Sequence, residues 1–308
     1  MKFQTVGWEH IEMNVPEDWK MIFEKEKYKS KAGKTGYFGF SDTIQRRLEL
    51  SYAEIEKKAP EITDVLKDYY KSLKKTYKKI EIRKEANSKI NDHLAKYIFW
   101  KKENIEGYIY SWICSKTKRL LICTSQYSKD EKSSLKQVIM DVISQINCHP
   151  NKEFSIWTAP NLQIHTPYLK MQLNSRDLLI GLTFLEFENK NITLFSYRIG
   201  LADQKIKSEE EIVDWFKTNY RKYLPRIPSK YNPEVFTKLV FKKKVNIWKN
   251  VESKKSIFHL KNVYFETYLW LNIEKNDIYC LIFSLKKQPS AKIRELIDNM
   301  TKLAIANN

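Results

Sequence analysis

Apolar residues recur at helical spacing in four segments of the chain, which predicts four amphipathic helices. The first lies within 62–80, and its apolar side consists of Ile62, Val65, Leu66, Tyr69, Leu73, Tyr77 and Ile80. The second opens with a capping-box pair, Ser208 and Glu211, and turns inward Ile212, Trp215, Phe216 and Tyr223. The third, over 128–147, opens with the pair Ser128 and Glu131 and buries Leu135, Val138, Ile139, Val142, Ile143 and Ile146. The fourth covers 290–304.

Between the helices, runs of β-branched and aromatic residues predict strands, for example over 97–100, 108–113 and 264–271. Short polar turns at 101–104, 116–118 and 274–277 join consecutive strands. Strands joined in this way pair antiparallel, because a parallel pair needs a crossover of a dozen or more residues. The pattern therefore disfavours a parallel Rossmann-type sheet.

Features of the first half recur in the second half in the same order, which indicates an internal duplication. The segment 15–21, containing Pro16 and Trp19, is echoed by 166–171, while 48–55 is echoed by 193–199 and 68–71 by 214–217. Each half then closes with a strand pair and a helix. We predict an α+β chain of two tandem copies, 1–150 and 151–308, each an antiparallel sheet packed with helices.

The order of elements in each copy resembles the PsbP-like fold. The resemblance is carried by Val15, Pro16 and Trp19, by the glycine-flanked strand 36–40, and by the strand-helix-strands-helix order that follows. The second copy departs from the pattern, since Leu169 stands where the tryptophan is expected. The resemblance implies a partner-binding module and carries no catalytic residue onto this chain.

Composition adds a net charge of +18, from 55 Lys and Arg against 37 Asp and Glu, which favours acidic partners such as nucleic acid. Lysine dominates arginine, and an AT-rich genome would produce a similar composition. No apolar run approaches the roughly 20 residues that cross a bilayer, and the N-terminus lacks the apolar segment of a signal peptide. We expect a cytoplasmic protein without membrane partners.

The sequence offers no recognisable reaction centre, and we predict no catalytic, cofactor-binding or metal-binding residues and no cofactor. Phosphate-binding glycine motifs are missing, and the stretch 33–36 is interpreted as a hairpin turn. The cysteines are scattered without a C-x-x-C pair, and Cys114 is expected to face Arg119 across a hairpin and not Cys123. Cys148 and His149, the one adjacent pair of potential ligands, are interpreted as a frayed helix end.

Two carboxylates on one face of a predicted strand, Glu186 and Glu188, are interpreted as a solvated face. The remaining candidate is a lysine-rich surface that could bind a polyanion, formed by Lys67, Lys71, Lys74, Lys75, Lys78, Lys79, Lys242, Lys243, Lys244 and Lys249. We predict a non-enzymatic interaction or scaffold protein with an unknown protein partner. The alternatives are a nucleic-acid-binding protein that uses these lysines, and an enzyme of unfamiliar type with a pocket between the copies.

Overall fold

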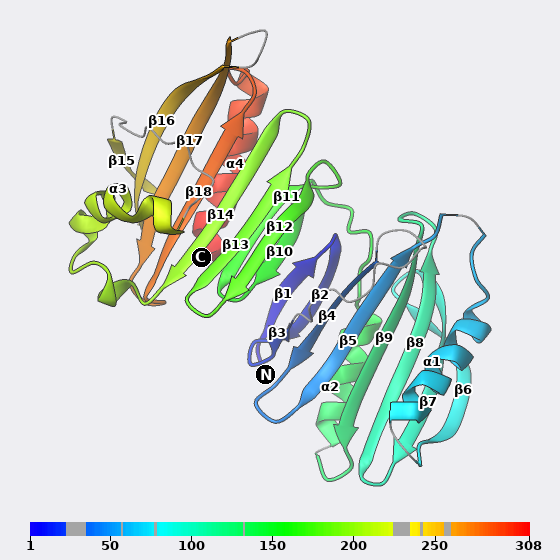
Figure 1. Cartoon of the computed structure of the whole chain (residues 1–308). Coiled ribbons are helices and arrows are strands. Elements are labelled where there is room, and N and C mark those ends of the chain that lie inside the picture. Colours follow the sequence, from blue (N-terminus) through cyan, green and yellow to red (C-terminus); the bar gives the residue numbers. More distant parts are fainter. Residues whose placement is uncertain are drawn as a thin grey trace. The chain divides into compact units, whose positions relative to one another are not determined.

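The computed structural model describes residues 1–22, 35–56, 58–76, 79–131, 133–223, 235–240, 243–255 and 260–308. The chain divides into two compact units, which we call unit 1 (Met1–Asn151) and unit 2 (Lys152–Asn308). Each unit combines antiparallel sheets with helices, so the predicted α+β class is confirmed (Figure 1). Among the described helices, none is both long and apolar enough to cross a membrane.

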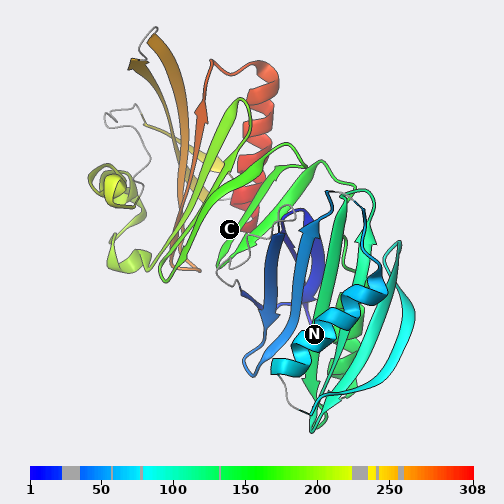
Figure 2. The ribbon, with the colours of Figure 1, turned by 45° about the vertical axis from the view of Figure 1, so that its right-hand side comes forward.

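Unit 1 begins with the hairpin of β1 (Phe3–Trp8) and β2 (Ile11–Pro16). Its seven-stranded sheet has the spatial order β3 (Lys20–Ile22), β4 (Thr35–Ser41), β5 (Arg46–Glu54), β9 (Arg119–Ser128), β8 (Ile105–Cys114), β7 (His93–Lys102) and β6 (Glu81–Ile90). Helix α1 (Ile62–Thr76) connects β5 to β6, and α2 (Ser133–Ser144) follows β9. In Figure 2 the two helices lie on opposite faces of the sheet.

The core of unit 1 follows from the two-residue period of its strands. Burial alternates strictly along the central strand β9. Ile98 and Ile109 pair with each other and point to the face that α1 covers with Leu66. Tyr110, one position further along β8, points to the opposite face, where its hydroxyl lies 3.5 Å from the sulfur of Met140 in α2.

Unit 2 begins with the hairpin of β10 (Phe154–Ala159) and β11 (Leu162–Pro167). Its seven-stranded sheet has the order β12 (Gln172–Leu179), β13 (Leu182–Glu188), β14 (Ile192–Gly200), β18 (Asp277–Leu285), β17 (Leu260–Asn272), β16 (Lys243–Lys255) and β15 (Val235–Val240). Two short 3-10 helices, η1 (Ala202–Gln204) and η2 (Glu209–Glu211), precede α3 (Ile212–Tyr223). Helix α4 (Ala291–Asn307) follows β18 and packs against β11.

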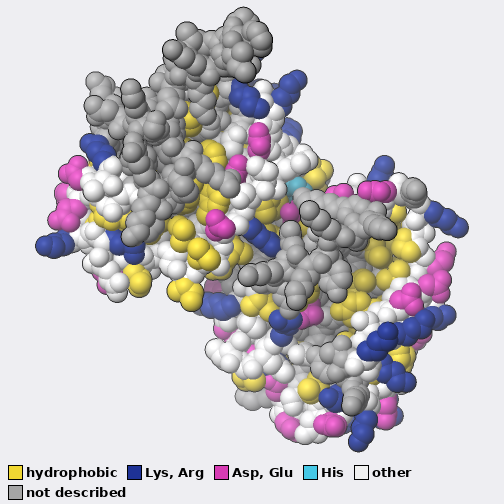
Figure 3. Space-filling model, in the orientation of Figure 1, with side chains coloured by type: hydrophobic (Ala, Val, Ile, Leu, Met, Phe, Trp, Pro, Cys, Tyr) yellow, Lys and Arg dark blue, Asp and Glu magenta, His cyan; other side chains and the backbone are white. Residues whose placement is uncertain are grey.

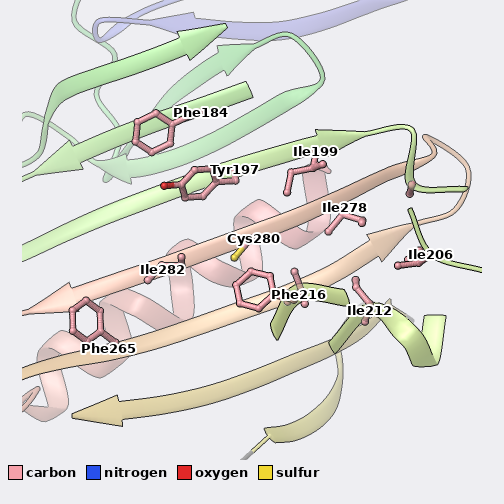
Figure 4. Packing of buried hydrophobic residues seen from close by; sticks show 12 residues of the cluster. Phe184, Tyr197, Ile199, Ile206, Ile212, Phe216, Phe265, Ile278, Cys280 and Ile282 are labelled. Atoms are coloured by element: carbon pink, nitrogen blue, oxygen red, sulfur yellow. The ribbon is translucent and has the colours of Figure 1, made fainter. Parts of the chain in front are cut away.

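The core between α3 and the sheet of unit 2 is built mainly from apolar side chains (Figure 4). Ile212 and Phe216 descend from α3 onto side chains of the central strands, including Tyr197 of β14 and Cys280 of β18. Both helical residues were predicted to turn inward, and both are fully buried. Tyr223 was also predicted to turn inward, but its side chain lies outside the described part of the structure.

The two seven-stranded sheets have the same strand order. When the strands of each sheet are counted along the chain, strands with the same count occupy the same position in their sheets. The hairpins β8–β9 and β17–β18 both have four-residue turns, so that Arg119 corresponds to Asp277 and Trp112 to Trp270. Both tryptophans are completely buried. Tyr110 and Tyr268 correspond in the same way.

The sequence match between 48–55 and 193–199 is wrong by one residue. Cys123 of β9 corresponds to Leu281 of β18. Cys123 pairs with Leu50 and Leu281 pairs with Ser196, so Ser196 corresponds to Leu50 and not to Ser51. Tyr52 therefore shares the α2 face of its sheet, while Tyr197 lies beneath α3. The match was suggested by a Ser-Tyr dipeptide in each half, but the two tyrosines point to opposite faces of their sheets. A shift of one residue moves every side chain of a strand to the other face.

Most predicted turns and strands are confirmed, including the three antiparallel connections between β7, β8 and β9 and between β17 and β18. Both predicted capping boxes are wrong. Glu131 accepts a hydrogen bond from the Ser128 N–H at 2.6 Å, but Ser128 ends β9 and α2 begins only at Ser133. The Ser208 side chain makes no cap hydrogen bond, and the Glu211 carboxylate accepts from the Lys207 N–H and not from that of Ser208.

Candidate functional site

The predicted lysine surface is divided between the two units. Lys67, Lys71, Lys74 and Lys75 are exposed on α1, and Lys79 is exposed just after it. Figure 3 shows dark blue Lys and Arg side chains gathered over this helix, with acidic side chains beside them. Two of the lysines are already paired, because Lys67 lies 3.9 Å from Asp64 and Lys71 lies 2.9 Å from Asp68.

Of the four lysines predicted in unit 2, the two whose side chains are described, Lys243 and Lys244, both have polar partners. The Lys243 ammonium donates to the Ile305 carbonyl at 2.8 Å, and Lys244 lies 3.4 Å from Glu210. Burial lowers the pKa of Lys243, which is half-buried. Lys78, Lys242 and the side chain of Lys249 lie outside the described residues.

The prediction of a solvated face is wrong for Glu186 and confirmed for Glu188. Glu186 is only 6% exposed and accepts a hydrogen bond from the Asn174 amide at 2.9 Å. Glu188 is exposed and lies 3.9 Å from Lys286. The two carboxylates share a face of β13 but have different surroundings, so they do not act as a pair.

A cavity of about 170 Å³ lies between α1 and the sheet of unit 1. Tyr69 and Leu73 of α1 line one side, and Glu49 and Thr124 of the sheet line the other. Ligand pockets usually measure about 300 Å³ or more. The carboxylate that lines this cavity, Glu49, already has partners, because Arg46 donates to it and the Thr124 hydroxyl donates to it at 3.4 Å.

Four potential metal ligands converge at one end of the unit 1 sheet, and we call them the Cys–His cluster: His93, Cys114, Cys148 and His149. His93 opens β7 and Cys114 ends the neighbouring strand β8. Ala95 of β7 pairs with Trp112 of β8, so two residues further along the same register His93 lies beside Cys114. Cys148 and His149 arrive from the segment after α2, which the bridge between Asn147 and Glu12 holds in place.

The donor atoms of the Cys–His cluster all lie within 4.8 Å of one another. His93 Nε2 is 3.1 Å from Cys148 Sγ, and His149 Nδ1 is 3.3 Å from Cys114 Sγ and 3.5 Å from Cys148 Sγ. Three of the residues are buried, and the His149 side chain is 12% exposed. The interpretation of Cys148 and His149 as a frayed helix end is therefore wrong.

Charged groups surround the Cys–His cluster on its outer side. Asp92 places one carboxylate oxygen 3.2 Å from His149 Nε2 and the other 3.2 Å from His93 Nε2. Lys116 Nζ lies 3.0 Å from His149 Nε2. The neighbouring thiol of Cys148, together with the Thr117 N–H, lowers the pKa of Cys114 to about 4 against the opposing effect of burial. The same thiol contact, with burial, raises the pKa of Cys148.

The other two cysteines do not take part in the Cys–His cluster. Cys123 and Cys280 are completely buried among apolar side chains, and burial raises the pKa of each thiol. All four cysteines are free, and Cys114 faces Arg119 as predicted. Within the described part of the chain, no second group of three or more such ligands is found.

Exposed apolar side chains gather at one end of the unit 2 sheet, on turns that follow one another along its edge. We call them the apolar rim: Leu179, Ile180, Leu201 and Ile273. Backbone hydrogen bonds join the turns, from Gly200 N to Gly181 O at 2.9 Å and from Ala202 N to Asn276 O at 3.0 Å. The side chain of Ile180 is fully exposed and that of Ile273 is 75% exposed.

No family model and no curated protein matches this sequence. Among solved structures, it is similar to LpqN, a protein involved in cell envelope biogenesis in Mycobacterium tuberculosis, with 15% identity over 48% of this chain and 91% of that chain (TM-score 0.33). It is also similar to the T6SS immunity protein TplEi of Pseudomonas aeruginosa, with 8% identity over 98% of this chain and 96% of that chain (TM-score 0.33). At these TM-scores the likenesses carry no argument about function, and the PsbP-like resemblance stays a prediction.

Proposed function

We propose that this chain is a non-enzymatic interaction protein, built from a duplicated α+β unit, that binds a protein partner through the apolar rim. The rim is the observation that carries the proposal. Exposed apolar residues scattered singly are ordinary, whereas a group on adjacent, hydrogen-bonded turns is typical of a binding surface. The rim favours a partner whose contact residues are apolar, and the net charge of +18 favours an acidic surface around those residues.

Two long edge strands argue against a partner that binds by adding a strand to a sheet. β6 contains five charged residues and a register shift between Ile82 and Lys84. β12 has a shift between Leu173 and Ser175 and carries Arg176 and Asp177. Charges and bulges at sheet edges prevent pairing with another chain, so side-chain contacts at the rim are the favoured mode.

The duplication is part of the proposal. It is supported by the matching strand order of the two sheets and by the correspondence of Trp112 with Trp270 and of Tyr110 with Tyr268. The PsbP-like assignment rests on the residues that suggested it, of which Trp19 is buried and 36–40 lies within β4. Expressing 1–151 and 152–308 separately tests the duplication. Halves that fold only when joined would contradict it.

The interaction is tested by affinity purification from native extract with the full chain and two variants. The double variant Ile180→Asp, Ile273→Asp places charges in the rim, and Ile44→Asp changes a side chain of unit 1 that is as exposed as Ile273. We expect the same partner to copurify with the wild type and with Ile44→Asp but not with the rim variant. The proposal fails if the wild type retains no partner or if the rim variant retains the same one. Light scattering of the purified chain reveals whether the rim instead joins two copies.

The alternative function is nucleic-acid binding through the exposed lysines of α1. Their exposure favours it, and their ion pairs with Asp64 and Asp68 weaken it. Counterion release would make such binding fall steeply with salt. In a salt series with labelled DNA and RNA, affinity no stronger than that of an unrelated basic protein would eliminate this alternative. A cytoplasmic location also belongs to the proposal and is supported by four free cysteines.

A further inference from the structure

We propose that the Cys–His cluster of unit 1 binds one Zn²⁺ ion through His93 Nε2, Cys114 Sγ, Cys148 Sγ and His149 Nδ1. Two sulfur and two nitrogen donors are a ligand set that tetrahedral zinc prefers. The site is independent of the apolar rim, which lies in unit 2. Failure of one proposal therefore leaves the other standing.

The spacing of the donors fits a tetrahedral ion. Zinc bonds of about 2.3 Å to sulfur and 2.0 to 2.1 Å to nitrogen place neighbouring ligand atoms about 3.3 to 3.8 Å apart. Three of the six ligand-atom distances are 3.1, 3.3 and 3.5 Å, and all six lie within 4.8 Å. The most widely separated ligand atoms need to approach by about 1 to 1.5 Å at most to admit the ion.

Asp92 supports the proposed site from outside. When Nδ1 of His149 binds the metal, Nε2 carries the proton and donates a hydrogen bond to Asp92, 3.2 Å away. The Lys116 ammonium, a donor 3.0 Å from the same nitrogen, then turns to the Asp92 carboxylate, from which it lies 3.6 Å. This carboxylate–histidine–metal arrangement fixes the imidazole and increases its basicity. The second oxygen of Asp92 lies near His93 Nε2. When the metal binds, this nitrogen coordinates the metal and gives up its contact with Asp92.

The ion would be structural, because four protein ligands close the coordination sphere and leave no position for a substrate. It would tie the segment after α2, through Cys148 and His149, to the ends of β7 and β8. His149 and Asp92 are partly exposed and give the ion a route from solvent.

The test is a cobalt titration of the full chain after removal of metal with a chelator under reducing conditions. We expect a thiolate-to-cobalt charge-transfer band and the intense visible absorption of tetrahedral cobalt, saturating at one ion per chain. Zn²⁺ should displace the cobalt and abolish both bands. Cobalt that binds without a charge-transfer band, or fails to saturate at one ion, would overturn the proposal.

Variants assign the ligands. Cys148→Ala should weaken Co²⁺ binding by more than about 100-fold, since a lost ligand costs more than the roughly 10- to 100-fold of a lost supporting carboxylate. The matched control Cys123→Ala removes another buried cysteine of unit 1 and should leave binding unchanged. Asp92→Asn, on a half-exposed turn, keeps the ligands and should weaken binding about tenfold. Equal effects of Cys148→Ala and Cys123→Ala would overturn the proposal. A Cys114–Cys148 disulfide that persists in the wild-type protein under the reducing conditions would do the same.

Discussion

One polar side chain in each unit, the half-buried His165 and the buried Arg47, makes stability depend on pH. In β11 of unit 2, burial lowers the pKa of His165 to about 4 from its ordinary 6.5. In unit 1, Arg47 is almost completely buried between two carboxylates, donating from Nε to Asp42 at 2.6 Å and from a terminal nitrogen to Glu131 at 2.7 Å. Each arrangement leads to a prediction for one substitution.

His165→Gln should remove a pH dependence from unit 2. Because the folded pKa lies below the unfolded one, the unfolded chain binds the extra proton, and stability falls as the pH drops from 6.5 towards 4. The loss amounts to about 3 kcal/mol across that window. Urea denaturation of both proteins at several pH values measures it. Parallel wild-type and variant curves would contradict the prediction.

Arg47→Met should destabilise unit 1 by about 3 to 5 kcal/mol at neutral pH, because it leaves two carboxylates without their buried partner. The bond from Arg47 lowers the pKa of Glu131, and the Gln45 and Ile44 N–H groups with Arg47 lower that of Asp42 despite burial. The contribution is present above the ordinary values of 4.5 and 3.8 and is lost as the pH falls through the lowered ones. Arg46→Met is the control, since its pair with Glu49 is partly exposed and should contribute at most about 1 kcal/mol.

Helix starts show how far local sequence determines an element. Ser208 and Glu211 have the spacing of a capping box but do not form one. At α4, by contrast, the Ser290 hydroxyl accepts from the Ile293 N–H at 3.4 Å. The difference lies in the backbone before the helix, where the η2 turn precedes α3, and the spacing of two residues does not reveal it.

Ser290→Ala should therefore cost about 1 kcal/mol of unit 2 stability, and Ser208→Ala much less. Both changes remove one hydroxyl before a helix of the same unit, which makes them a matched pair. Chemical denaturation measures both. Equal losses for the two variants would show that the observed cap has no special role.

Strands and turns were predictable because alternation and short polar turns determine neighbouring antiparallel pairs, as in β7, β8 and β9. The Cys–His cluster was not predicted, because its ligands come from three separated segments and have no recognised spacing. A usable signal did exist. Counting back from the β7–β8 turn, where Lys102 pairs with Ile105, places His93 opposite Cys114. The position of Cys148 depends on how the segment after α2 packs against the sheet, and no local sequence pattern predicts that packing.

At the scale of the whole molecule, the two units have separate cores, and the proposed metal belongs to unit 1 alone. Metal that binds only the folded state stabilises it by about 4 kcal/mol at a thousandfold excess over its dissociation constant. A chelator should therefore lower the Tm of the unit 1 transition by about 10 °C. The unit 2 transition should stay in place and serves as the internal control for calorimetry. A shift of both transitions together would contradict the assignment of the metal to one unit.

The convergence of His93, Cys114, Cys148 and His149 is tested most directly by X-ray absorption at the zinc edge of the full chain, purified under reducing conditions. We predict one zinc ion per chain, with two sulfur neighbours at about 2.3 Å and two nitrogen neighbours at about 2.0 Å. Protein without zinc, or zinc surrounded only by oxygen and nitrogen, would contradict the account.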